Sequence, residues 1–181
     1  MAFPNGQVWS ARHAAMKFDA ASDVTITTNA NLSSFWGSGT ACLNAKNVTI
    51  TLPTVTADAV PMVGVDSGSF QNMGLERKPV GLTKLTATLV LDADEVFETE
   101  VLTAVTISSA VAAKRYQVDA NQKDTAILVY MTSVAGTDQV AFGLARCIVG
   151  FGDIKVTSDG HVEQDIEAYC LPKDTYWEYY D

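Results

Sequence analysis

The residues that could carry chemistry are few and widely spaced. The sequence has two histidines, His13 and His161, and three cysteines, Cys42, Cys147 and Cys170. Neither histidine has another ligand-type residue at metal spacing, and no two cysteines form a CxxC pair, so a zinc site is not indicated. Cys147 lies in the largely apolar stretch LARCIVG, residues 144–150, with no adjacent base, which is typical of an inert buried thiol. We therefore predict no metal and no other cofactor.

Motifs for catalysis are also missing. The chain has no GxSxG, Walker or dinucleotide-binding motif. Gly143, Gly150 and Gly152 resemble a glycine-rich loop, but they lie inside a strand pattern that leads into no helix, so phosphate binding is not indicated. We predict no catalytic residues. Two rivals stay open: an enzyme acting on sugars, and a carbohydrate-binding module in which Phe35 and Trp36 stack on a sugar.

One acidic segment is more informative. In HVEQDIEAYC, residues 161–170, the strand period of two places Glu163, Asp165 and Glu167 on one face, and apolar residues and Gln164 on the other. Three carboxylates in a row repel one another unless water or a partner screens them. The segment is either an ordinary solvent-facing strand or a surface that is kept negative for a function.

These residues must be positioned by strands. Alternation of β-branched or apolar residues with polar ones predicts strands. The segments with this pattern are 23–30, 47–53, 82–91, 125–134, 139–157 and 160–171. Ser158, Asp159 and Gly160 predict a hairpin turn between the last two, and the glycines of 139–157 predict bulges or bends.

Two further segments complete the prediction. Asp92 and Glu95 form a capping box, and apolar residues recur at four-residue steps from Phe97 to Val105, so a helix is expected over about 93–106. Residues 53–81 have no strong period and predict a long extended loop, which in a compact domain usually has a function.

The whole chain is expected to be a single domain, 1–181, with a mainly β fold. The expected architecture is an antiparallel β-sandwich or partly closed barrel with one flanking α-helix and the long extended loop. Hydrophobic residues make up 48% of the 181, enough for a core. The net charge of −9 argues against conventional DNA readout. No signal peptide or membrane span is recognisable, so synthesis in the cytoplasm without membrane insertion is expected.

The middle third of the chain resembles a known family. A strand ending in Thr51-Leu52-Pro53 is followed by a glycine- and methionine-bearing segment around 68–74, with Met73, and then by a second strand from Leu82 to Leu91. This order is similar to that of the tail tube proteins, or major tail proteins, of tailed bacteriophages. The resemblance leaves open whether the tail is contractile.

The resemblance implies a structural role. Proteins of this family form hexameric rings that stack into a hollow tube through which the genome is ejected. The implied partners are other copies of the chain, the tape measure protein, baseplate or tail-tip and terminator proteins, and a sheath if the tail contracts. Double-stranded DNA would pass through the lumen without specific binding, and the protein would reside in the virion.

Three groups of residues receive roles under this resemblance. Glu163, Asp165 and Glu167 would face the lumen and repel phosphate. The assembly loop, 53–81, would pack on a neighbouring subunit through Met62, Val63, Phe70, Met73, Leu75, Arg77 and Lys78. The C-terminal aromatics would bury against an adjacent ring, so deletion of 174–181 should leave a folded chain that does not polymerise; they are Tyr176, Trp177, Tyr179 and Tyr180.

Two structural rivals share the β-rich, acidic profile. One is a capsid decoration protein, which would bind capsids as a monomer or trimer and not polymerise alone. The other is a related ring-forming tube protein of a type VI secretion system. Ring or tube formation by the purified chain separates the first rival from the tube proteins.

Overall fold

The structure is a computed structural model. It describes residues 9–37, 40–42, 45–61, 73–91, 101–105, 115–117, 123–133, 139–156, 158 and 162–180. Strands dominate these residues and pair antiparallel, which confirms the mainly β prediction. Among them, no helix is long and apolar enough to cross a membrane.

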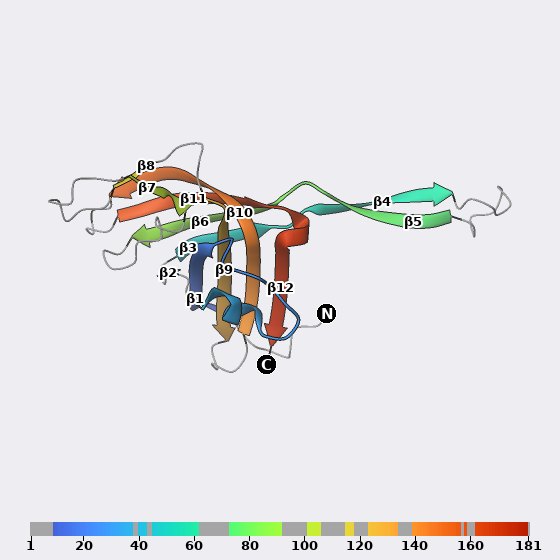
Figure 1. The fold of residues 1–181 in the computed structure, drawn as a ribbon, viewed down its shortest axis with the longest axis horizontal. Helices are drawn as coiled ribbons and strands as arrows, with labels where there is room; N and C mark the ends of the chain where they lie inside the picture. The colour runs from blue at the N-terminus through green and yellow to red at the C-terminus, as the bar shows by residue number, and fades with distance from the viewer. Residues whose placement is uncertain are drawn as a thin grey trace.

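Twelve strands and two short 3-10 helices follow one another in the described ranges (Figure 1). The strands are β1 Trp9–Ala20, β2 Thr40–Cys42, β3 Ala45–Thr51, β4 Thr54–Pro61, β5 Met73–Val80, β6 Thr83–Leu91, β7 Thr103–Val105, β8 Arg115–Gln117, β9 Thr125–Ser133, β10 Gln139–Val156, β11 Val162–Cys170 and β12 Thr175–Tyr180. The 3-10 helices are η1 Leu32–Trp36 and η3 Pro172–Asp174.

The main sheet has eight strands and is organised around β10. Its order is β2-β1-β9-β10-β11-β6-β3, and β12 also pairs with β10. The first part of β10 lies between β9 and β12, and from Cys147 onward it pairs with β11. A register shift against β9 between Leu144 and Cys147 marks this change of partner. In Figure 1, β10 curves from the lower part of the body into the upper part.

Side-chain alternation fixes which face of each strand is buried. On β6, Leu85, Ala87 and Leu89 are buried, whereas Thr86 and Thr88 are only partly so. On β11, burial recurs at every second residue from Gln164 to Cys170. Val156 pairs with Val162, so β10 and β11 form the hairpin that the sequence predicts.

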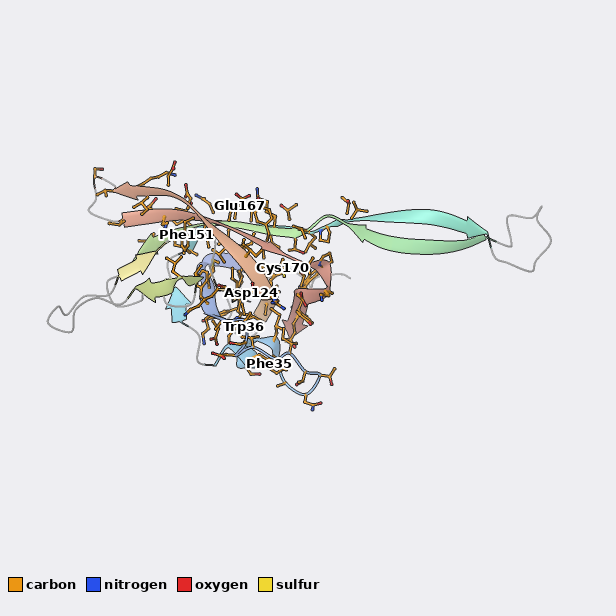
Figure 2. The ribbon with its side chains drawn as sticks, turned by 45° about the horizontal axis from the view of Figure 1, so that its top comes forward. Phe35, Trp36, Asp124, Phe151, Glu167 and Cys170 are labelled. Carbon is orange, nitrogen blue, oxygen red and sulfur yellow. The ribbon has the colours of Figure 1, made fainter. Side chains whose placement is uncertain are left out.

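Two hydrophobic clusters lie on the two faces of the strands around β9 and β10. The first joins β1, β6, β9, β10 and β11 and contains Met16, Phe18, Leu85, Ala87, Leu89, Val101, Leu102, Ile127, Val129, Leu144, Cys147, Val149, Ile166, Ala168 and Cys170. The second contains Val24, Leu32, Trp36, Ala126, Leu128 and Ala141. Figure 2 shows Phe35 and Trp36 at the opposite end of the body from Glu167.

The segment around η1 covers the second cluster. Trp36 is fully buried, as expected for a core residue, and Phe35 packs partly buried beside it. The Glu178 carboxylate on β12 accepts a hydrogen bond from the Leu32 N–H at the start of η1. Asn31, at the N-cap position, makes no side-chain cap bond, so Glu178 satisfies a backbone donor that local sequence leaves open.

The strand predicted over 23–30 is wrong. Residues 24–27 have no regular structure and 28–30 form a turn and a bend. Val24 and Ile26 instead pack on the second cluster, so this segment crosses a sheet face and pairs with no sheet edge. β1 and β12 were not predicted, because their apolar and polar residues do not alternate cleanly.

The flanking helix predicted over 93–106 is not supported. Thr103–Val105 form β7, which pairs with β8 through Thr103 with Gln117 and Val105 with Arg115. Residues 93–100 and 106 of the predicted helix lie outside the described residues, and Val101 has a helical backbone. The β-branched residues at 103 and 105 fit this strand, and pairing with a distant segment overrides the four-residue period.

The loop predicted over 53–81 is largely a β-hairpin. β4 and β5 pair in continuous register from Thr54 with Val80 to Pro61 with Met73. They form a separate two-stranded sheet that projects from the body in Figure 1. We call this hairpin the arm; residues 62–72 lie outside the described residues. Threonine and valine in β4 favour the strand, although their alternation is too irregular to predict it.

Candidate functional surface

The three carboxylates of β11 each contact a lysine from a different strand. Glu163 pairs with Lys46 of β3, Asp165 with Lys155 of β10, and Glu167 with Lys84 of β6. We call these six residues the charged ladder. The nitrogen–oxygen distances are 2.7 Å for Lys46–Glu163 and 2.6 Å for Lys155–Asp165.

Polar neighbours complete the ladder. The Thr88 hydroxyl donates to Asp165 Oδ1 at 2.7 Å, and the Tyr169 hydroxyl donates to Glu167 Oε1 at 2.5 Å. Lys84 Nζ also lies 5.7 Å from the centroid of the Tyr169 ring, a cation–π distance. Cross-strand lysines and hydroxyls therefore screen the repulsion expected from three carboxylates on one strand face.

The pKa values follow these contacts. The Lys155 hydrogen bond, followed by that of Thr88, lowers the pKa of Asp165 below its ordinary value. Lys84 and then Tyr169 lower the pKa of Glu167 in the same way, and the pKa of Lys84 is raised in return. The ladder thus sets three lysines against three carboxylates.

A shallow hollow of about 400 Å³ lies beside the ladder. Gly150 and Gly152 of β10 line it together with Asp165, Glu167 and Tyr169 of β11. A Cβ at Gly152 would come within 3.1 Å of the Asp165 Cβ. Gly152 thus lets β10 approach the carboxylate strand. Within the described residues, Gly150 and Gly152 lead into no helix and form no phosphate loop.

The assembly residues proposed for the arm are placed only in part. Met73, Leu75, Arg77 and Lys78 lie on β5, of which the structure describes the backbone. Their register partners on β4 are Pro61, Ala59, Ala57 and Thr56. Met62, Val63 and Phe70 lie outside the described residues.

The C-terminal aromatic residues belong to a strand. β12 pairs with β10 over its whole length, from Thr175 with Leu144 to Tyr180 with Gln139. Tyr176 packs against the second cluster, and Tyr179 is partly buried. Trp177 is 52% exposed and stacks on Phe142 with ring centroids 5.6 Å apart. Of the described side chains in this group, Trp177 is thus the most available to another molecule.

Among the candidate metal and nucleophile residues, the structure describes the side chains of Cys147 and Cys170, which form a thiol pair. Cys147 and Cys170 are opposed in register across β10 and β11, and both are free and buried. The side chains of His13, Cys42 and His161 lie outside the described ones. Among the side chains that are described, no three His, Cys, Asp or Glu residues lie close enough to bind a metal ion.

The sequence patterns did not lead to a prediction of the ladder lysines. Lys84 shares the polar face of its strand with Thr86 and Thr88, which was a usable signal. Lys155 lies on the strand that the predicted hairpin pairs with 160–171, so the hairpin turn was a usable signal for it. That Lys46 lies near the same strand depends on the strand order, which local pattern does not give. Comparison of the chain with models of known protein families and with curated proteins finds no match.

Proposed function

We propose that the chain is a structural subunit that forms hexameric rings, stacked into a hollow bacteriophage tail tube through which DNA is ejected. The observation that carries this proposal is the arm. A two-stranded hairpin is marginal in water unless a further surface packs on it. The arm forms its own sheet and extends from the body (Figure 1), so contact with another copy would provide that surface.

The bend of β10 supports the finer fold that this role requires. It brings the two parts of the main sheet over one core, as in a β-sandwich or partly closed barrel. The edge of β12 that does not face β10 has no strand partner among the described residues. Such an edge can pair with a neighbouring copy when a ring closes.

Glu163, Asp165 and Glu167 were placed in the lumen because carboxylates repel phosphate. The charged ladder weakens this electrostatic argument. Each carboxylate has a lysine partner, so a phosphate backbone would meet equal numbers of both charges on the ladder. Repulsion of DNA would then rest on other acidic residues of a chain whose net charge is −9. The lumen assignment of these three residues stays a proposal.

An arm deletion tests the proposal. Replacing residues 55–79 with Asn-Gly joins Thr54 to Val80, which are register partners, through a turn that suits a two-residue hairpin. We expect the wild-type chain to form rings or tubes in negative-stain electron microscopy over a concentration series. The deletion variant should keep a cooperative thermal unfolding transition and remain monomeric.

Two results would count against this assignment. Tubes formed by the deletion variant would show that the arm is not the assembly element. A wild-type chain that stays monomeric or trimeric at every concentration would favour a capsid decoration protein. Rings would leave the secretion-system tube protein as an alternative.

A further inference from the structure

We propose that Cys147 and Cys170 are a disulfide-forming pair that a peroxide oxidises within the folded chain. The two residues are register partners on antiparallel strands. Opposed residues in such a ladder have Cα atoms about 4.5 or 5.5 Å apart. Both separations fall within the range that a disulfide spans, so the bond requires little movement of the backbone.

The surroundings of the two sulfurs keep the pair together and exclude bulky reagents. Both residues are 1% exposed and belong to the first cluster. Cys147 Sγ lies 3.6 Å from the Leu144 carbonyl oxygen, and Cys170 Sγ lies 3.4 Å from the Asp174 carbonyl oxygen. A small oxidant such as hydrogen peroxide fits this setting better than a bulky disulfide.

The two thiols are unequal. The hydrogen bond from Cys147 lowers the pKa of Cys170 to about 7, against the opposing effect of burial. The same hydrogen bond and burial raise the pKa of Cys147. Near neutral pH, Cys170 supplies the thiolate that attacks an oxidant, and Cys147 holds the proton until the second step.

The reaction balances with one peroxide. The Cys170 thiolate attacks a peroxide oxygen, the O–O bond breaks, and hydroxide leaves and is protonated to water while Cys170 becomes a sulfenic acid. Cys147 then loses its proton and attacks the Cys170 sulfur. The S–O bond breaks, a second water leaves and the S–S bond forms. Two thiols are oxidised and one peroxide is reduced to two waters.

The position of the bond gives it a structural effect. It would link β10 to β11 where β10 changes partner from β12 to β11. A cross-link between Cys147 and Cys170 restricts the unfolded chain, so the oxidised protein should unfold at a higher denaturant concentration than the reduced one. This inference does not depend on the proposed tube function.

The test uses the full chain in a Cys42→Ser background, which leaves only this pair. After treatment with hydrogen peroxide, we expect the free thiols to fall from two per chain to none. The mass should decrease by two hydrogens, and one peptide should join Cys147 to Cys170. Dithiothreitol should reverse all three changes. Peptide mapping of the wild-type chain in parallel makes the result independent of how the variant folds.

Two single variants separate the roles of the sulfurs. In Cys147→Ser, Cys170 should stop at a sulfenic acid that dimedone traps. In Cys170→Ser, Cys147 should stay reduced under the same treatment. Failure of the folded chain to react, sulfinic acid at Cys170 beside an unmodified Cys147, or disulfides only between chains would each overturn the proposal.

Discussion

At Gly143, the lack of a side chain makes room for the second cluster. A Cβ there would lie 3.0 Å from Leu32 Cδ2 and 3.0 Å from the Trp36 ring. Both distances are shorter than ordinary carbon contacts, and both neighbours are buried. A side chain at this position therefore requires the Leu32 and Trp36 side chains to shift.

We expect Gly143→Ala to lower the free energy of unfolding by about 1–3 kcal/mol, the usual effect of overpacking a core. Gly150→Ala is the matched control on the same strand, because its Cβ would meet only the Glu167 carbonyl oxygen at an ordinary 3.6 Å. Urea denaturation followed by circular dichroism measures both. Equal midpoints for the two variants would contradict the close packing of η1 on β10.

The pKa of Asp165 gives a second prediction for single residues. It lies below the ordinary value of 3.8, first through Lys155 and then through Thr88. Because the folded pKa is the lower one, the ionised carboxylate stabilises the fold above pH 3.8. This contribution is lost as the pH falls below 3.8 through the folded pKa. The ion pair is exposed, so its effect on stability should be small.

Lys155→Met should raise the pKa of Asp165 towards 3.8, because it removes the largest stabiliser of the carboxylate. Thr88→Val should raise this pKa less. NMR titration of the carboxyl carbon follows the change directly. A pKa that does not move in Lys155→Met would show that the ion pair does not form in solution.

Among the elements, β12 has a role that the sequence did not reveal. It pairs with β10, its Thr175 hydroxyl lies 2.8 Å from that of Thr83, and Glu178 accepts the Leu32 N–H. We therefore expect deletion of 174–181 to destabilise the monomer. This differs from the prediction made from the sequence, in which the shortened chain stays folded but does not polymerise. Lower solubility and a lower midpoint of thermal unfolding would show this effect.

Trp177→Ala is the control for this deletion, since it keeps the strand and its backbone hydrogen bonds. It removes the stacking on Phe142, which is worth about 1 kcal/mol. The variant should stay folded, so any assembly defect would report on contact with another copy. A truncated chain as stable as the wild type would show that β12 is dispensable to the fold.

For the whole molecule, charge should govern association. Copies with a net charge of −9 repel one another, and salt screens this repulsion, with a Debye length of about 10 Å at 0.1 M. If the chain assembles, sedimentation velocity should show a larger assembled fraction at about 0.15 M NaCl than at about 0.01 M. Assembly that weakens with salt would mean that ion pairs between copies dominate the contact.

The sequence by itself determined the mainly β class and the side chains that share a face along 82–91 and 160–171. A strand has a period of two, so the alternation along 82–91 and 160–171 shows which side chains share a face wherever one face is buried. The β10–β11 hairpin followed from its local turn residues and its flanking strands. These features depend on neighbours in the chain.

Tertiary structure alone decided the features that depend on distant pairing. Thr103–Val105 form a strand because they pair with β8. Residues 24–27 lie over the second cluster, without strand structure, because Val24 packs into that cluster. The charged ladder needs three strands to place their lysines beside one carboxylate strand. Local propensity is too weak to encode strand order, which follows from burial over the whole sheet.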